Sequence, residues 1–165
     1  GWQVVTVDIN PDFKPDVVID LRQWSYSGPR PDMVWCSPPC DEFSREFMPW
    51  SKTGNLPDMS IVLACKRIID ECQPCFWVIE NVKGAIRWFE PVLGRYRVNY
   101  GPFYLWGFFP IPGDFRLIYR KKESRSSSAA SERAKIPAQL STGIMLAIEN
   151  QLLLFWKIIK CLNNN

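Results

Sequence analysis

The chain has 165 residues and a formal net charge of +3, with 47% hydrophobic and 14% aromatic residues. A chain of this length and composition is expected to form one globular domain with a substantial core, which excludes an intrinsically disordered protein. It contains no histidine, so catalysis by Ser-His or Cys-His pairs is excluded, as is metal binding through histidine.

Three short apolar runs occupy the first 40 residues. Residues 4–7 predict a buried strand followed by a turn, and residues 16–20 repeat the pattern with three apolar residues before an acid. Residues 32–36 form the third run and lead into Ser37-Pro38-Pro39-Cys40. Each proline fixes φ and lacks an N–H donor, so this turn is stiff and should hold the following side chain at a defined angle.

The middle of the chain alternates helical and strand patterns. Residues 59–71 carry apolar side chains at helical spacing, and residues 76–79 form a fourth apolar run. Residues 83–93 predict a second helix, and two later strands are expected at 97–100 and 104–109. This alternation predicts an α/β fold with a mainly parallel sheet.

The composition changes beyond residue 113. Residues 114–135 hold seven basic and three acidic side chains around a serine-rich stretch, which predicts a flexible loop. We expect this loop to contact nucleic-acid phosphates, while a solvated basic surface is the alternative; the basic residues concerned are Arg120, Lys121, Lys122 and Arg125. Pro137 then fits the first turn of a C-terminal helix, whose apolar run is too interrupted for a membrane span.

The six cysteines come without a secretory signal, which indicates a reducing compartment. Cys72 and Cys75 have the spacing of a redox or zinc pair. No second pair or histidine is present to complete a zinc site, so two ordinary thiols at a helix end are the favoured interpretation and no metal is expected.

A cysteine and a glutamate follow two of the predicted strands. Cys40 comes after the third apolar run and Glu80 directly after the fourth. A thiolate that adds to C6 of cytosine activates C5 toward a methyl group, and an acid near N3 stabilises the adduct. Taken alone, Cys40 could be a small residue in a turn and Glu80 a helix N-terminal acid, but their sequence contexts weaken both interpretations.

The order of Ser37-Pro38-Pro39-Cys40 and Glu80-Asn81-Val82 resembles the cytosine-5 DNA methyltransferase family, especially its compact phage-type members. The resemblance implies that Cys40 is the nucleophile, that Glu80 contacts the target cytosine and that Asn81 supports the loop. It also implies a Rossmann-like methyltransferase fold. Residues 1–148 are then the catalytic domain, 114–135 stand in place of a recognition region and 149–165 are a C-terminal tail.

The resemblance further implies S-adenosylmethionine as cofactor. Asp8 matches the acid that binds the ribose hydroxyls, Ile9 would pack on the adenine, and Asp20 with Leu21 matches the motif at the adenine edge. Pro39 completes the expected cofactor-binding set. The family's N-terminal glycine-rich loop has no counterpart here, so we expect an N-terminally truncated fold that binds the cofactor weakly.

The family pattern therefore predicts methyl transfer to C5 of cytosine in DNA, through a covalent Cys40 adduct. The alternative is a truncated or inactive homologue that keeps the fold and binds nucleic acid without turnover. Methylation of an exocyclic amine is disfavoured because Cys40 occupies the turn. DNA is the expected partner, without a membrane or a metal, and the expected location is the cytoplasm of a bacterial or phage-infected cell.

Overall fold

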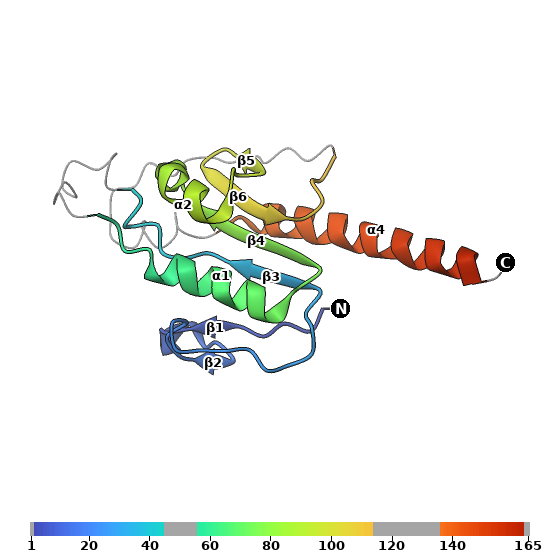
Figure 1. Cartoon of the computed structure of the whole chain (residues 1–165), viewed down its shortest axis with the longest axis horizontal. Helices are drawn as coiled ribbons and strands as arrows, with labels where there is room; N and C mark the ends of the chain where they lie inside the picture. The colour runs from blue at the N-terminus through green and yellow to red at the C-terminus, as the bar shows by residue number, and fades with distance from the viewer. Residues whose placement is uncertain (1, 45–55, 114–135, 164–165) are drawn as a thin grey trace.

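The computed structural model describes residues 2–44, 56–113 and 136–163, with side chains up to residue 155. The basic segment 114–135 therefore lies outside the described residues. Figure 1 shows a central sheet between two helical layers, with α1 and α2 on one side and the long α4 on the other. The α/β class expected from the sequence is confirmed at this level.

The central sheet has four strands in the order β3-β4-β6-β5. The strands are β3 (Met33–Cys36), β4 (Phe76–Asn81), β6 (Phe103–Phe108) and β5 (Val98–Tyr100). Only β3 and β4 are parallel, while β4–β6 and β6–β5 are antiparallel. The prediction of a mainly parallel sheet is therefore wrong. Tyr100 pairs with Phe103, so only Gly101 and Pro102 join β5 to β6, and a two-residue turn can only connect antiparallel strands.

A separate pair of parallel strands lies near the start of the chain, β1 (Val7–Asp8) and β2 (Val17–Val18). Backbone bonds from Val17 N to Thr6 O (3.0 Å) and from Ile19 N to Asp8 O (3.1 Å) hold the pair together. The strand expected over 4–7 is shorter and less buried than predicted, because Val4 and Val5 are exposed. Within the described residues, β1 pairs with β2 but has no strand on its other edge.

One face of the central sheet is covered by α1 (Ser60–Cys72) and by α2 (Ile86–Leu93), which follows a short 3-10 turn, Lys83–Ala85. Both helices match the predicted ranges closely. The apolar spacing that predicted α1 turns its inner face onto the sheet, where one buried cluster forms. Its members are Phe43, Val62, Cys65, Ile69, Ile79, Ala85, Phe89 and Trp106.

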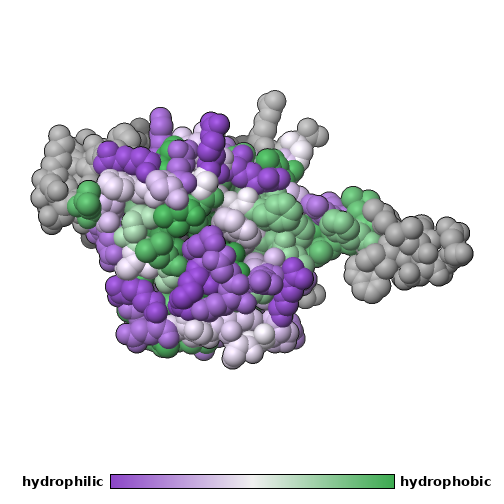
Figure 2. All heavy atoms as spheres, in the orientation of Figure 1, coloured by the Kyte–Doolittle hydropathy of each residue, from purple (hydrophilic) through white to green (hydrophobic). Residues whose placement is uncertain are grey.

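The opposite face is covered by α4 (Ala138–Asn163). Leu140, Ile144 and Ile148 recur every four residues on this helix and are fully buried against Phe76, Val78, Phe103 and Leu105. The helix continues unbroken through the position where the catalytic domain and the tail were expected to meet. Figure 2 shows apolar side chains exposed on the described part of α4 that extends from the body. Leu153, Leu154 and Phe155 of this helix are more than half exposed. None of the helices in the described ranges is both long and apolar enough to cross a bilayer.

Candidate active site

The parallel pairing of β3 with β4 sets the geometry of the candidate site. Cys36, the last residue of β3, is in register with Ile79 of β4. Both strands end at the same edge of the sheet, so the turn from Ser37 to Cys40 lies beside the last residues of β4. Glu80 and Asn81 are the final two residues of β4 itself, which extends two residues beyond the predicted strand.

Asn81 joins the two strand ends. Its Nδ2 donates a hydrogen bond of 2.9 Å to the carbonyl oxygen of Pro38, and its Oδ1 accepts one of 2.9 Å from the backbone N–H of Val82. The side chain is only 1% exposed. A buried amide with donor and acceptor both satisfied fixes the Pro-Pro turn relative to β4.

Cys40 begins a compact turn that is anchored in the core. Its carbonyl oxygen accepts hydrogen bonds from Phe43 N (3.1 Å), Ser44 N (3.0 Å) and Ser44 Oγ (2.9 Å). Phe43 is buried and packs edge-to-face on Phe89 of α2, with 4.9 Å between the ring centroids. The backbone of Cys40 is therefore held from both sides, by the prolines before it and by Phe43 after it.

Glu80 is one of two buried polar side chains in the described part of the chain, and it is 8% exposed. Burial raises the pKa of its carboxyl group to about 7, although a hydrogen bond from the Ser37 side chain opposes the shift. The carboxyl group is therefore about half protonated near neutral pH, so it can act as a proton donor.

The Cys40 thiol lies close enough to Glu80 for their charges to interact. Its pKa is raised first by burial, then by the neighbouring charge of Asp41, and then by Glu80. Thiolate is the nucleophilic form, so these effects lower the reactive fraction at neutral pH. The contribution of Glu80 is absent when its carboxyl group is protonated, which is also the form in which Glu80 can donate a proton.

Cys36 differs from Cys40 in its surroundings. Its side chain packs against the buried cluster under α1, where a hydrogen bond with Cys65 together with burial raises the pKa of its thiol well above the usual value. Cys36 therefore lies against the core on this face of the sheet. Of these two thiols, Cys40 is the one beside Glu80.

The expected ribose and adenine contacts lie at the end of β1. Asp8 is half-buried, and its Oδ1 accepts a hydrogen bond of 2.7 Å from Asn10 N. Ile9 follows with 64% of its side chain exposed, which is unusual for isoleucine and leaves an apolar surface beside the acid. Leu21 packs on the first core cluster, and Pro39 is exposed in the turn before Cys40.

Asp20 is engaged by a partner that the sequence analysis did not identify. The guanidinium group of Arg22 contacts both carboxylate oxygens, with Nη2–Oδ2 at 2.6 Å, and the Arg22 backbone N–H reaches Oδ1 at 2.9 Å. These hydrogen bonds lower the pKa of Asp20. A basic residue two positions after a turn acid is the sequence signal that could have indicated the pair.

The remaining predicted residues are not part of this arrangement. Arg120, Lys121, Lys122 and Arg125 lie outside the described residues. Cys72 is buried at the end of α1 and Cys75 is half-buried, both as free thiols. In the part of the chain that the structure describes, no group of three or more His, Cys, Asp or Glu side chains could hold a metal ion.

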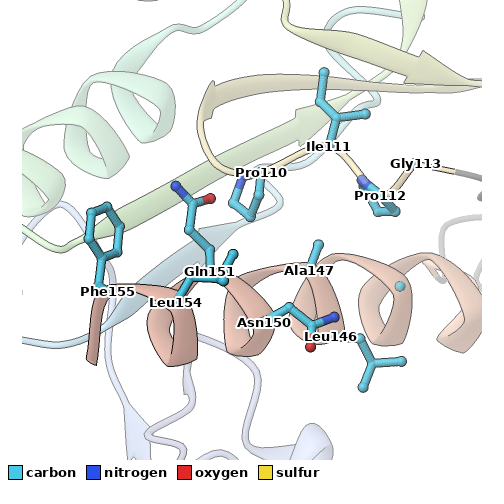
Figure 3. A pocket seen from close by; sticks show the side chains of 11 residues that line it. Pro110, Ile111, Pro112, Gly113, Leu146, Ala147, Asn150, Gln151, Leu154 and Phe155 are labelled. Carbon is cyan, nitrogen blue, oxygen red and sulfur yellow. The ribbon is translucent and has the colours of Figure 1, made fainter. Parts of the chain in front are cut away.

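A separate hollow lies between α4 and the segment after β6. Figure 3 shows this groove, which has a volume of about 620 Å³ and is lined mainly by apolar residues. Its walls include Pro110 and Ile111 on one side and Ala147 and Leu154 of α4 on the other. Neither Cys40 nor Glu80 lines it, so it is not the candidate active site.

Comparison with known proteins gave one distant relative. No protein-family model matches the chain, and no solved structure matches it. The chain is 28% identical over 124 residues to a protein of Frog virus 3 (isolate Goorha) named probable DNA (cytosine-5)-methyltransferase. The match covers 66% of this chain and 56% of that protein, so the chain spans little more than half of its relative's length. The chain is thus distantly similar to a viral protein with that name.

Proposed function

We propose that the chain carries the catalytic site of an S-adenosylmethionine-dependent DNA cytosine-5 methyltransferase, with Cys40 as nucleophile and Glu80 as acid. The observation that carries the proposal is that two groups lie together at the ends of β3 and β4. The Cys40 thiol is on a turn that Asn81 fixes, and beside it lies the buried carboxyl group of Glu80, whose pKa is about 7. The name of the viral relative supports the same reaction class.

The proposed chemistry uses each group in one role. The Cys40 thiolate attacks C6 of cytosine and forms an S–C6 bond, while protonated Glu80 donates to N3 and stabilises the charge that develops on the ring. The electrons of the former C5–C6 double bond make C5 nucleophilic, so C5 takes the methyl group. Water then takes the C5 proton, the C5–H electrons restore the C5–C6 double bond, and the S–C6 bond breaks to release the Cys40 thiolate, while N3 returns its proton to Glu80. The base must leave the duplex stack for Cys40 to reach C6.

Some of the residues at the end of β1 suit the adenosine part of S-adenosylmethionine. S-adenosylmethionine would supply the methyl group when bound. Asp8 offers a carboxylate at the end of β1, and the exposed Ile9 offers the apolar surface on which an adenine ring packs. Asp20 could accept a hydrogen bond from the adenine edge only alongside Arg22, which already contacts both of its oxygens.

The test is covalent trapping of the full chain on duplex DNA that contains 5-fluorocytosine, with S-adenosylmethionine added. Fluorine at C5 cannot leave as a proton does, so the Cys40 adduct should persist through denaturing electrophoresis. We expect the adduct with the unaltered chain and with Cys36→Ser, but not with Cys40→Ser. An adduct that survives Cys40→Ser and disappears with Cys36→Ser would refute the assignment.

The second candidate function is nucleic-acid binding without turnover. The engagement of Asp20 by Arg22 favours it, because this contact competes with the expected adenine contact. We expect weak or undetectable S-adenosylmethionine binding by residues 1–165 in calorimetry. Low-micromolar binding together with the Cys40 adduct would reject the second candidate. DNA binding with no adduct in any variant would support it.

A further inference from the structure

The carboxylate of Asp20 is saturated with hydrogen-bond donors from a single residue, Arg22. Arg22 Nε lies 3.0 Å from each carboxylate oxygen, and Nη2 lies 2.6 Å from Oδ2. The backbone N–H of Arg22 donates to Oδ1 at 2.9 Å. A carboxylate offers about four lone-pair sites for hydrogen bonds. Another donor can therefore bond to Asp20 only when Arg22 gives up one of these contacts.

Asp20 lies at the edge of the small sheet where the proposed adenosine contacts are found. β1 and β2 are parallel, with Asp8 in register with Val18, so both strands end at the same edge. Ile9 follows β1 directly and is 64% exposed, and Asp20 comes shortly after β2. The apolar surface of Ile9 and the acceptor oxygens of Asp20 therefore belong to one edge of this sheet.

Arg22, rather than Asp20, is the partner that can give way. The Asp20 side chain is 15% exposed, and the Asp20 carbonyl oxygen accepts a 2.9 Å bond from Gln23 N, which fixes the turn. The Arg22 side chain is 48% exposed, so its guanidinium group can turn without opening the core. Arg22 Nη1 also lies 3.4 Å from Ser60 Oγ, which donates to the Asp58 carboxylate at 2.9 Å. A displaced guanidinium group would therefore stay near a second acid.

We propose that Arg22 limits adenine binding at this edge, because its guanidinium group must release an Asp20 oxygen before the adenine amino group can donate to that oxygen. The amino group is the part of adenine that a carboxylate can recognise, since a carboxylate only accepts hydrogen bonds. The proposal rests on the function proposed above in its occupant, the adenosine part of S-adenosylmethionine. Arg22 is thus an inhibitory contact within the turn after β2, and it favours the ligand-free state.

The experiment is a nitrogen-15 NMR titration of the full chain with adenosine, without DNA. A parallel titration uses purine riboside, which is adenosine without the amino group. We expect Arg22→Ala to bind adenosine about three- to tenfold more tightly than the unaltered chain, as for one hydrogen bond no longer in competition with an exposed ion pair. The affinity for purine riboside should not change, because that nucleoside has no amino group to donate to Asp20.

Two further variants serve as controls. Arg30→Ala removes another exposed guanidinium group, which bonds to the carbonyl oxygen of Gln73 at the end of α1, and it should leave both affinities unchanged. Adding Asp20→Ala to Arg22→Ala removes the acceptor itself, so the gain in adenosine affinity should disappear. Both nucleosides are uncharged, so the lost positive charge alone should affect neither affinity.

Several results would overturn the proposal. An unchanged, weaker or undetectable affinity of Arg22→Ala for adenosine does so, and so does an equal gain for purine riboside. Should near-ultraviolet circular dichroism show that Arg22→Ala does not fold, Arg22→Lys decides. A lysine ammonium keeps the charge but lacks the planar fork that contacts both oxygens, so adenosine should still bind more tightly. An unchanged affinity in Arg22→Lys would then overturn the proposal equally.

The trapping assay separates this proposal from the proposed function. A gain in adenosine affinity in Arg22→Ala, without a Cys40 adduct in any variant, rejects the proposed function and leaves the role of Arg22 intact. A Cys40 adduct together with an unchanged adenosine affinity in Arg22→Ala does the reverse.

Discussion

The side-chain amide of Asn81 donates a 2.9 Å hydrogen bond to the carbonyl oxygen of Pro38, and so connects the end of β4 to the turn that carries Cys40. Asn81→Ala should therefore destabilise the fold by about 1–3 kcal/mol in urea denaturation, because a buried carbonyl and the Val82 N–H both lose their partner. Asn99→Ala is the matched control. Its exposed amide reaches Gly101 O at 3.3 Å, and its loss should cost less than about 0.5 kcal/mol. Equal losses in both variants would contradict the connecting role of Asn81.

The raised pKa of Glu80 makes stability depend on pH. The pKa is 4.5 for an ordinary glutamate and about 7 here, so between these values the folded state binds more protons than the unfolded state. The free energy of unfolding should fall as pH rises from 4.5 to 7, by about 3 kcal/mol in total, and this contribution should be constant above that range. Glu80→Gln should remove this part of the slope, whereas Glu71→Gln on the surface of α1 should retain it. Urea titrations at several pH values measure the slopes, and a Glu80→Gln slope equal to that of the unaltered chain would contradict the expectation.

The charge of Asp41 should slow the reaction of the neighbouring thiol. Asp41 raises the pKa of Cys40, so Asp41→Asn should increase the thiolate fraction. We expect Cys40 to be alkylated by iodoacetamide about two- to fivefold faster at pH 7.5 and low salt, as for one exposed charge acting through mostly aqueous surroundings. Mass spectrometry of the peptide that contains Cys40 isolates its rate from those of the other thiols. Asp70→Asn, which removes a carboxylate paired with Lys66 on α1, should have no effect on that rate.

The basic segment 114–135 should control how DNA binding responds to salt. Phosphate contacts release counterions, so each lost contact flattens the plot of log affinity against log salt. The triple variant with Arg120, Lys121 and Lys122 replaced by alanine should reduce the slope by up to about three contacts' worth, with little change in sequence preference. Fluorescence anisotropy with a labelled duplex at increasing salt measures it. An unchanged slope would mean that these side chains form only a solvated surface.

The sequence was most informative where the apolar pattern was strongest. The spacing in residues 59–71 and the runs before Cys40 and Glu80 predicted α1, β3 and β4 closely, because burial on a sheet requires those patterns. The direction of the later strands was predicted wrongly, since strand polarity depends on pairing between segments rather than on composition.

The candidate site, too, was predicted only in part from the sequence. Cys40 and Glu80 were predicted from their sequence contexts, and the structure brings them near each other. The contacts of Trp35 with Ser37 and of Arg22 with Asp20 were not predicted. Trp35 lies in an apolar run, and no periodicity indicates where its indole N–H points. Arg22 engages Asp20 through the geometry of one turn, which apolar patterns do not report.

The small β1–β2 sheet has a consequence for local dynamics. Its backbone hydrogen bonds are few, its side chains are half-buried or exposed, and within the described residues it shares no strand pairing with the four-stranded sheet. Segments of this kind open independently of global unfolding, so amide hydrogens around Asp8 and Ile19 should exchange with solvent much faster than those of β4. The proposed adenosine contacts of Asp8 and Ile9 therefore lie on a segment that should be poorly protected from exchange. A ligand that binds there should slow amide exchange in β1 and β2 while β4 is unaffected, so exchange protection can detect binding independently of any methyl transfer.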